Sequence, residues 1–80
     1  MREQQLVVPL LEKRLIEAWP EVGGTFAAQF SDAQEIRQKT LYVHVRNAAL
    51  RADLSMMRSQ LVDALNAKVG ARIINEIVFR

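Results

Sequence analysis

The chain has 80 residues, half of them apolar, and a formal net charge of +2. This length predicts one small domain over residues 1–80 with a thin hydrophobic core. The sequence has no cysteine, which excludes disulfides and thiolate chemistry, and no apolar run approaches the roughly 20 residues of a membrane span. Because no secretory signal pattern is visible either, we expect a cytoplasmic protein that does not bind a membrane.

The N-terminal region predicts a flexible lead-in followed by a helix. Residues 1–8 are expected to form a frayed or extended segment, and Pro9 suits the first turn of a helix, where a missing N–H costs nothing. Apolar residues then recur at helical spacing at Leu11, Leu15, Ala18 and Trp19. Pro20 should end this helix, because the residue before a proline disfavours the α conformation.

The middle of the chain predicts a turn, a second short helix and a β-hairpin. The segments expected are a turn at 20–24, a helix at 24–30, a break at Ser31 and Asp32, and strands at 33–37 and 40–46. Gln38 and Lys39 form the two-residue tip between the strands, although this tip lacks the glycine that such turns prefer. The second strand alternates apolar and polar residues, as a half-buried strand does.

The C-terminal half predicts one long helix followed by a third strand. Asn47 can cap the helix, whose inner face carries Leu50, Leu54, Met57, Leu61 and Leu65. Gly70 should end the helix in a left-handed conformation. A strand over 73–79 follows, in which the core-facing residues are Ile73, Ile77 and Phe79 and the outward-facing residues are Ile74 and Val78.

The order helix, helix, strand, strand, helix, strand predicts an α+β fold. The hairpin makes the first two strands antiparallel, and the helical link makes the second and third strands parallel through a right-handed crossover. We therefore expect a three-stranded mixed sheet with the helices on one face. The core should bring together Leu15, Trp19, Leu54, Leu61 and Phe79.

Five residues are candidates for binding a partner or a nucleic acid: Tyr42, His44, Arg46, Arg51 and Arg58. The first three share the outward face of one strand. There, an aromatic ring, an imidazole and a guanidinium either resemble a small stacking platform for bases or form an ordinary solvated sheet face. The other two share the outer face of the long helix, where they either bind phosphate or an acidic partner or simply face solvent.

The sequence carries no pattern for catalysis. His44 is the only histidine, so no second histidine or cysteine can complete a metal site with it. Neither the P-loop motif nor the glycine motif of dinucleotide-binding proteins is present. We therefore expect a protein that is not an enzyme and that uses no cofactor or metal.

Five runs of residues, in this order and at this spacing, resemble one protein family: 15–24 (LIEAWPEVGG), 40–45 (TLYVHV), 50–54 (LRADL), 65–70 (LNAKVG) and 77–80 (IVFR). Together they span nearly the whole chain and are similar to the DciA-like family of small bacterial proteins. The resemblance implies a KH-like fold and an accessory role in the initiation of DNA replication. Characterised members bind the replicative helicase, help to load it, and bind DNA.

Three functions follow as alternatives. The leading one is an adaptor that binds the replicative helicase. Its DNA binding is expected to be weak, because family members often carry a basic C-terminal extension whereas this sequence ends at Arg80. The second is a general nucleic-acid-binding module, although the G-x-x-G loop of RNA-binding KH domains is missing. The third is a self-associating scaffold domain, suggested by the outward-facing Ile74 and Val78.

Overall fold

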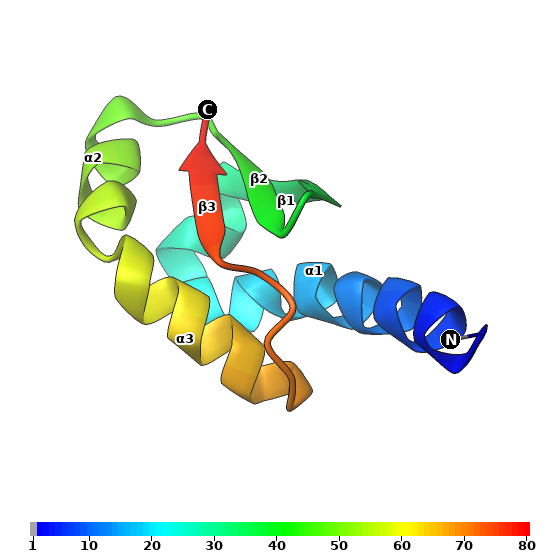
Figure 1. The fold of residues 1–80 in the computed structure, drawn as a ribbon. Coiled ribbons are helices and arrows are strands. Elements are labelled where there is room, and N and C mark those ends of the chain that lie inside the picture. The colour runs from blue at the N-terminus through cyan, green and yellow to red at the C-terminus, as the bar shows by residue number, and fades with distance from the viewer. Residues whose placement is uncertain (1) are drawn as a thin grey trace.

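The computed structural model describes residues 2–80, with side chains described from Val8 onward. The elements follow one another as α1 (Arg2–Phe30), β1 (Ser31–Arg37), β2 (Thr40–Val45), α2 (Ala48–Met56), α3 (Arg58–Val69) and β3 (Glu76–Phe79) (Figure 1). The strands form one sheet in the order β1-β2-β3, in which β1 is antiparallel and β3 is parallel to β2. The predicted α+β fold with a three-stranded mixed sheet is confirmed, whereas its likeness to KH domains stays a prediction.

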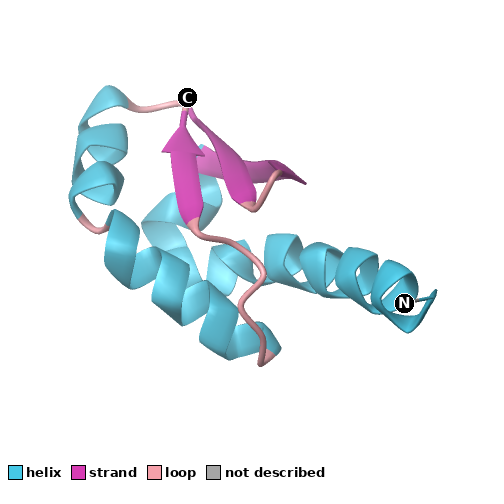
Figure 2. Ribbon diagram, viewed as in Figure 1, coloured by secondary structure: helices cyan, strands magenta, loops and turns pink. Residues whose placement is uncertain are grey.

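The helices cover one face of the sheet and leave the other face open (Figure 2). Leu41, Val43 and Val45 of β2 are buried against the helices. Tyr42 and His44 alternate with them and therefore point away from the core. Helices α1 and α3 pack against each other beneath β1 and β3, and α2 packs against β2 and β3. The alternation of apolar and polar residues predicted correctly which side chains of this strand reach the core.

Helix α1 is longer than the sequence predicts. It is helical from Arg2, so the extended form of the expected lead-in is wrong for residues 2–8, whereas its flexibility stays a prediction, and Met1 lies outside the described part of the chain. Pro20 lies inside the helix, which breaks only at Gly24, where a φ of 91° falls in the left-handed region that favours glycine. Pro20 is exposed while Trp19 beside it is fully buried, so packing outweighs the local bias of proline.

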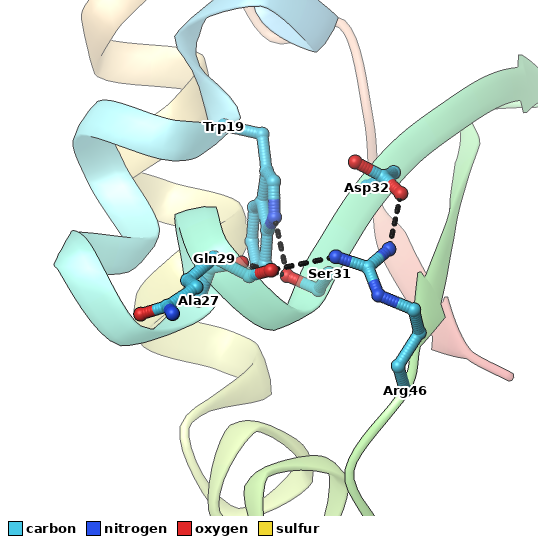
Figure 3. A network of polar contacts seen from close by, with 6 residues as sticks. All are labelled: Trp19, Ala27, Gln29, Ser31, Asp32 and Arg46. Carbon is cyan, nitrogen blue, oxygen red and sulfur yellow. Dashed lines mark hydrogen bonds and ion pairs between the residues drawn. The ribbon is translucent and has the colours of Figure 1, made fainter.

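Strand β1 begins at Ser31, directly after α1. The buried Ser31 hydroxyl accepts a 3.0 Å hydrogen bond from Nε1 of Trp19 and donates one to the carbonyl oxygen of Ala27 (Figure 3). These bonds fix the point at which the helix gives way to the strand. The predicted break at Ser31 and Asp32 is therefore wrong, because the hydroxyl satisfies polar groups that the core would otherwise leave unpaired.

The two-residue hairpin tip at Gln38 and Lys39 is confirmed. Both residues have a left-handed φ, 51° and 60°, which is the conformation of a type I′ turn without its usual glycine. Farther along the hairpin, the register of β1 shifts between Ala33 and Glu35 because one strand carries an extra residue. This bulge places Glu35 opposite Tyr42 on the open face of the sheet.

The prediction of a single long helix after Asn47 is wrong, because the chain bends at Met57. Asn47 caps α2 as expected, since its Oδ1 accepts a 2.9 Å hydrogen bond from the N–H of Leu50. Met57 has φ −102° and ψ 13°, and α3 begins at the next residue. Because of the bend, α2 packs on β2 and β3 while α3 packs on α1. The apolar stripe of one straight helix could not face both of these surfaces.

Asn66 of α3 organises the segment between α3 and β3. Its buried side chain accepts hydrogen bonds from the N–H groups of Ile73 (2.9 Å) and Ile74 (3.1 Å), and its Nδ2 donates one of 2.9 Å to the Ile74 carbonyl. The predicted strand over 73–79 therefore forms only from Glu76. Ile74 is fully buried, which corrects the expectation that it faces outward, whereas Val78 is exposed as expected.

The residues predicted for the core are buried, except Phe79. Leu15, Trp19, Leu54 and Leu61 are buried in one cluster. Phe79 is only half-buried, and its ring lies 6.1 Å from that of Trp19, measured between centroids. Phe79 therefore covers the buried indole from the edge of the core instead of lying inside it.

Gly70 ends α3 with φ 78° and ψ 19°, as predicted. We expect Gly70→Val to lower the free energy of unfolding by roughly 1–2 kcal/mol relative to Gly70→Asn, because asparagine adopts the left-handed conformation more readily than a β-branched residue. Thermal unfolding followed by circular dichroism measures the difference. A Cβ at this position meets no atom within 4 Å, so the difference reports backbone strain alone. Equal melting temperatures would contradict this account.

Asn66→Ala should lower the free energy of unfolding by roughly 2–5 kcal/mol, because it leaves three buried backbone groups without partners. Urea unfolding monitored by the fluorescence of Trp19 measures this loss. Asn75→Ala is the matched control, since Asn75 is exposed and its backbone N–H, which the substitution keeps, donates a 2.8 Å hydrogen bond to the Lys39 carbonyl. If both variants lose the same stability, the assignment of Asn66 as the organiser of this segment fails.

Candidate partner-binding surface

Tyr42 is the centre of the open face of the sheet. It lies in the middle strand, beside Glu35 of β1 and Val78 of β3. The guanidinium carbons of Arg37 and Arg80 lie 4.7 Å and 4.6 Å from the centre of its ring, within the range of cation–π contacts. Two cations, one from the end of β1 and one from the residue after β3, therefore converge on one aromatic ring.

Glu35 holds both arginines in place. Its Oε1 lies 3.4 Å from Nε of Arg37, and its Oε2 lies 3.3 Å from Nη2 of Arg80. The same Nη2 donates a 3.2 Å hydrogen bond to Oε1 of Gln34, so the side chain of Arg80 reaches from β3 across β2 to β1. Exposed ion pairs of this kind add little stability, but they orient the two guanidinium groups. We call Glu35, Arg37, Tyr42, Val78 and Arg80 the arginine–tyrosine face.

The arginine–tyrosine face suits an acidic partner better than a free base. Guanidinium groups bind carboxylates and phosphates through paired N–H donors. Val78, which is 38% exposed, adds an apolar contact beside them. Because two guanidinium groups already lie against the Tyr42 ring, a base that stacks on this ring competes with them. Tyrosine and arginine are also the residues most enriched where binding energy concentrates in protein interfaces.

His44 and Arg46, predicted to share this face, have different surroundings. His44 is exposed one step along β2 from Tyr42, on the same side of the sheet. Arg46 lies beyond the end of β2, where its Nη1 is 2.5 Å from Oδ2 of Asp32 and its Nη2 donates a 2.6 Å hydrogen bond to the Gln29 carbonyl (Figure 3). Arg46 thus closes the C-terminal end of α1, where a cation is favourable.

Arg51 is half-buried and supports the fold. Its Nη2 donates a 3.1 Å hydrogen bond to the carbonyl of Val45, and its Nε is buried without a hydrogen-bond partner among the described residues. The side chain therefore ties α2 to the end of β2. Substituting Arg51 would disturb folding as well as any contact with a partner.

Arg58 lies on another part of the molecule, at the start of α3. Its Nε is 3.7 Å from Oε1 of Glu76, and it lines an open, polar cleft together with Arg72, Ser55 and Ser59. Arg51 and Arg58, predicted to share the outer face of one helix, therefore have different contacts: Arg51 bonds to the end of β2 and Arg58 pairs with Glu76. The sequence placed both on one straight helix, and the bend at Met57 separates them.

The structure thus groups Tyr42 with His44 and leaves Arg46, Arg51 and Arg58 in three other environments. Sequence reasoning missed Arg37 and Arg80, which contact Tyr42 directly. The alternation of side chains along the last strand could have identified Arg80, because residue 80 falls on the same outward-facing side as Val78. The contact itself depends on the register between strands, which the sequence does not specify.

In the part of the chain that the structure describes, no group of three or more histidine, cysteine, aspartate or glutamate side chains is placed to hold a metal ion. Among the same residues, no helix is both long enough and apolar enough to cross a membrane.

The sequence was compared with known proteins. Residues 1–79 match the family described as "Dna[CI] antecedent, DciA". The chain is also similar to a UPF0232 protein of Corynebacterium glutamicum (strain R), with 32% identity over 59 residues. That match covers 74% of this chain and 33% of the relative, so the chain spans about a third of the length of the relative.

The family match extends over nearly the whole chain and confirms the resemblance carried by the five sequence runs. The family is one of replication accessory proteins. From residue 1 to residue 79, this chain belongs to the DciA family.

Proposed function

We propose that this protein is a non-enzymatic accessory module of DNA replication that binds the replicative helicase through the arginine–tyrosine face. Family membership supports the association with replication. The observation that carries the choice of surface is the convergence of Arg37 and Arg80 on the Tyr42 ring. Such a protein would act in the cytoplasm, where the helicase works.

The physical basis of this binding is a preorganised pair of cations. Glu35 and the aromatic ring already hold both guanidinium groups, so less side-chain entropy is lost when a partner binds. A carboxylate on the partner can replace Glu35 as the ligand of either arginine. Val78 and the edge of Tyr42 then exclude water from the contact and strengthen it.

A second candidate function, nucleic-acid binding, is favoured by the cleft at the start of α3. Arg58 and Arg72 line this cleft with two serine hydroxyls, which are groups that contact phosphates, beside the carboxylates of Asp63 and Glu76. If this function is correct, affinity for an oligonucleotide falls steeply with salt, because each phosphate contact releases counterions.

The third alternative, a self-associating scaffold, rested on two outward-facing apolar residues, Ile74 and Val78. It loses one of them, since Ile74 is buried.

The double variant Arg37→Glu, Arg80→Glu should bind the helicase of the same organism at least roughly ten-fold more weakly than the wild type, because it reverses both cations at a predicted hot spot. Both residues are exposed at the surface, so circular dichroism should show an unchanged fold. Isothermal titration calorimetry with the purified helicase measures the affinity.

Arg58→Glu, Arg72→Glu is the matched control, since it makes the same change in charge at the cleft. We expect this variant to keep the affinity for the helicase and to lose the salt-dependent affinity for a single-stranded oligonucleotide, measured by fluorescence anisotropy at two salt concentrations. Helicase binding that survives the change at the arginine–tyrosine face would sink the surface assignment. A wild-type protein that does not bind the helicase at tens of micromolar would sink the proposed function itself.

A further inference from the structure

A groove separates α1 from the free edge of β1, next to the arginine–tyrosine face, with which it shares only Glu35. Its apolar floor comes from Pro9 and Ile16 of α1 and from Ile36 of β1. The two isoleucines are half-buried: each packs on the core with part of its surface and leaves the rest open. The N-terminal half of α1 extends past the sheet and runs alongside this edge (Figure 1).

The strand that borders the groove has a free edge. β1 is the first strand in the sheet order and pairs only with β2 among the described residues. In an antiparallel pair, every second residue directs its N–H and C=O groups away from the partner strand, so β1 presents unpaired backbone groups over the groove. The opposite edge is less open, because β3 has four residues and packs beside α2 and α3.

The rim of the groove carries a local negative charge on a protein that is positive overall. Three carboxylates, those of Glu12, Glu17 and Glu35, line the groove with one cation, Lys13, whereas the whole chain has a net charge of +2. Glu35 is already paired with two arginines. Glu12 and Glu17 form no ion pair within the described part of the chain, so they remain for a partner.

We propose that this groove binds an extended, basic segment of a partner protein, which adds as a fourth strand to the free edge of β1. Backbone hydrogen bonds to β1 supply affinity, and the alternation of side chains in the added strand supplies specificity. Apolar side chains of the segment lie on Ile16 and Ile36, and its lysine or arginine side chains reach Glu12 and Glu17. This site differs from the helicase surface in charge and in partner chemistry, and the free carboxylates that it uses, Glu12 and Glu17, do not belong to that surface.

The probe is a capped peptide of alternating valine and lysine, about as long as a typical strand. A peptide with glutamate in place of lysine is the control for charge. Titration into isotopically labelled protein, followed by amide chemical shifts and hydrogen exchange, should show binding of the lysine peptide with protection confined to amides of β1. Protection of outward-pointing amides distinguishes strand addition from the docking of a helix.

The double variant Glu12→Lys, Glu17→Lys should bind the lysine peptide at least roughly ten-fold more weakly, since it reverses the free charges of the rim. Asp53→Lys, Asp63→Lys is the matched control, because both residues are exposed, neither lines the groove, and the change in charge is identical. We expect the control to keep nearly all of the affinity and the β1 protection pattern.

Three results would overturn the proposal. The first is no binding of the lysine peptide at millimolar concentration. The second is equal weakening by the two double variants, which would mean that only net charge matters. The third is peptide binding without protection of β1, or equal binding of the glutamate peptide. Loss of helicase binding by the arginine–tyrosine face variants bears on none of these outcomes, so the two proposals fail separately.

Discussion

The buried indole of Trp19 is the contact on which the other elements depend. It is fully buried, its Nε1 donates to Ser31 at the start of β1, and its ring packs against Phe79 at the end of β3. Ser31 in turn donates to the Ala27 carbonyl in the last segment of α1. One side chain therefore joins the first helix to both outer strands of the sheet. Its burial also explains why α1 continues through Pro20, since a break there would withdraw the indole from the core.

Asn66 has the corresponding role at the other end of the sheet. By bonding the backbone of Ile73 and Ile74, it takes the place of a neighbouring strand and sets where β3 starts. That start fixes the parallel register in which Val78 lies beside Tyr42. Arg80 can then cross the sheet and meet Glu35 over the Tyr42 ring. The geometry of the candidate surface thus depends on a buried amide in α3 that makes no contact with it.

Local signals predicted the elements well where one residue determines one conformation. Asn47 caps α2, Gly70 ends α3 in the left-handed region, and the hairpin turns at the expected pair. Predictions failed where a local preference competes with packing. Pro20 does not end α1. No sequence signal marks the bend at Met57, because packing against α1 and the sheet sets this bend, and those residues lie far away in the sequence.

Residue order was enough to predict the α+β class, the inward and outward phases of β2, most of the core and, through five runs of residues, membership of the DciA family. These properties rest on periodicity and residue order, which are local. Which charged side chains contact one another depends instead on how the elements pack together. Arg37 and Arg80 reach Tyr42 because a bulge in β1 and the parallel pairing of β3 bring three strands into one register, while the bend at Met57 moves Arg58 to a separate cleft. Such contacts depend on the relative placement of distant elements, and hydrophobic periodicity leaves that placement open.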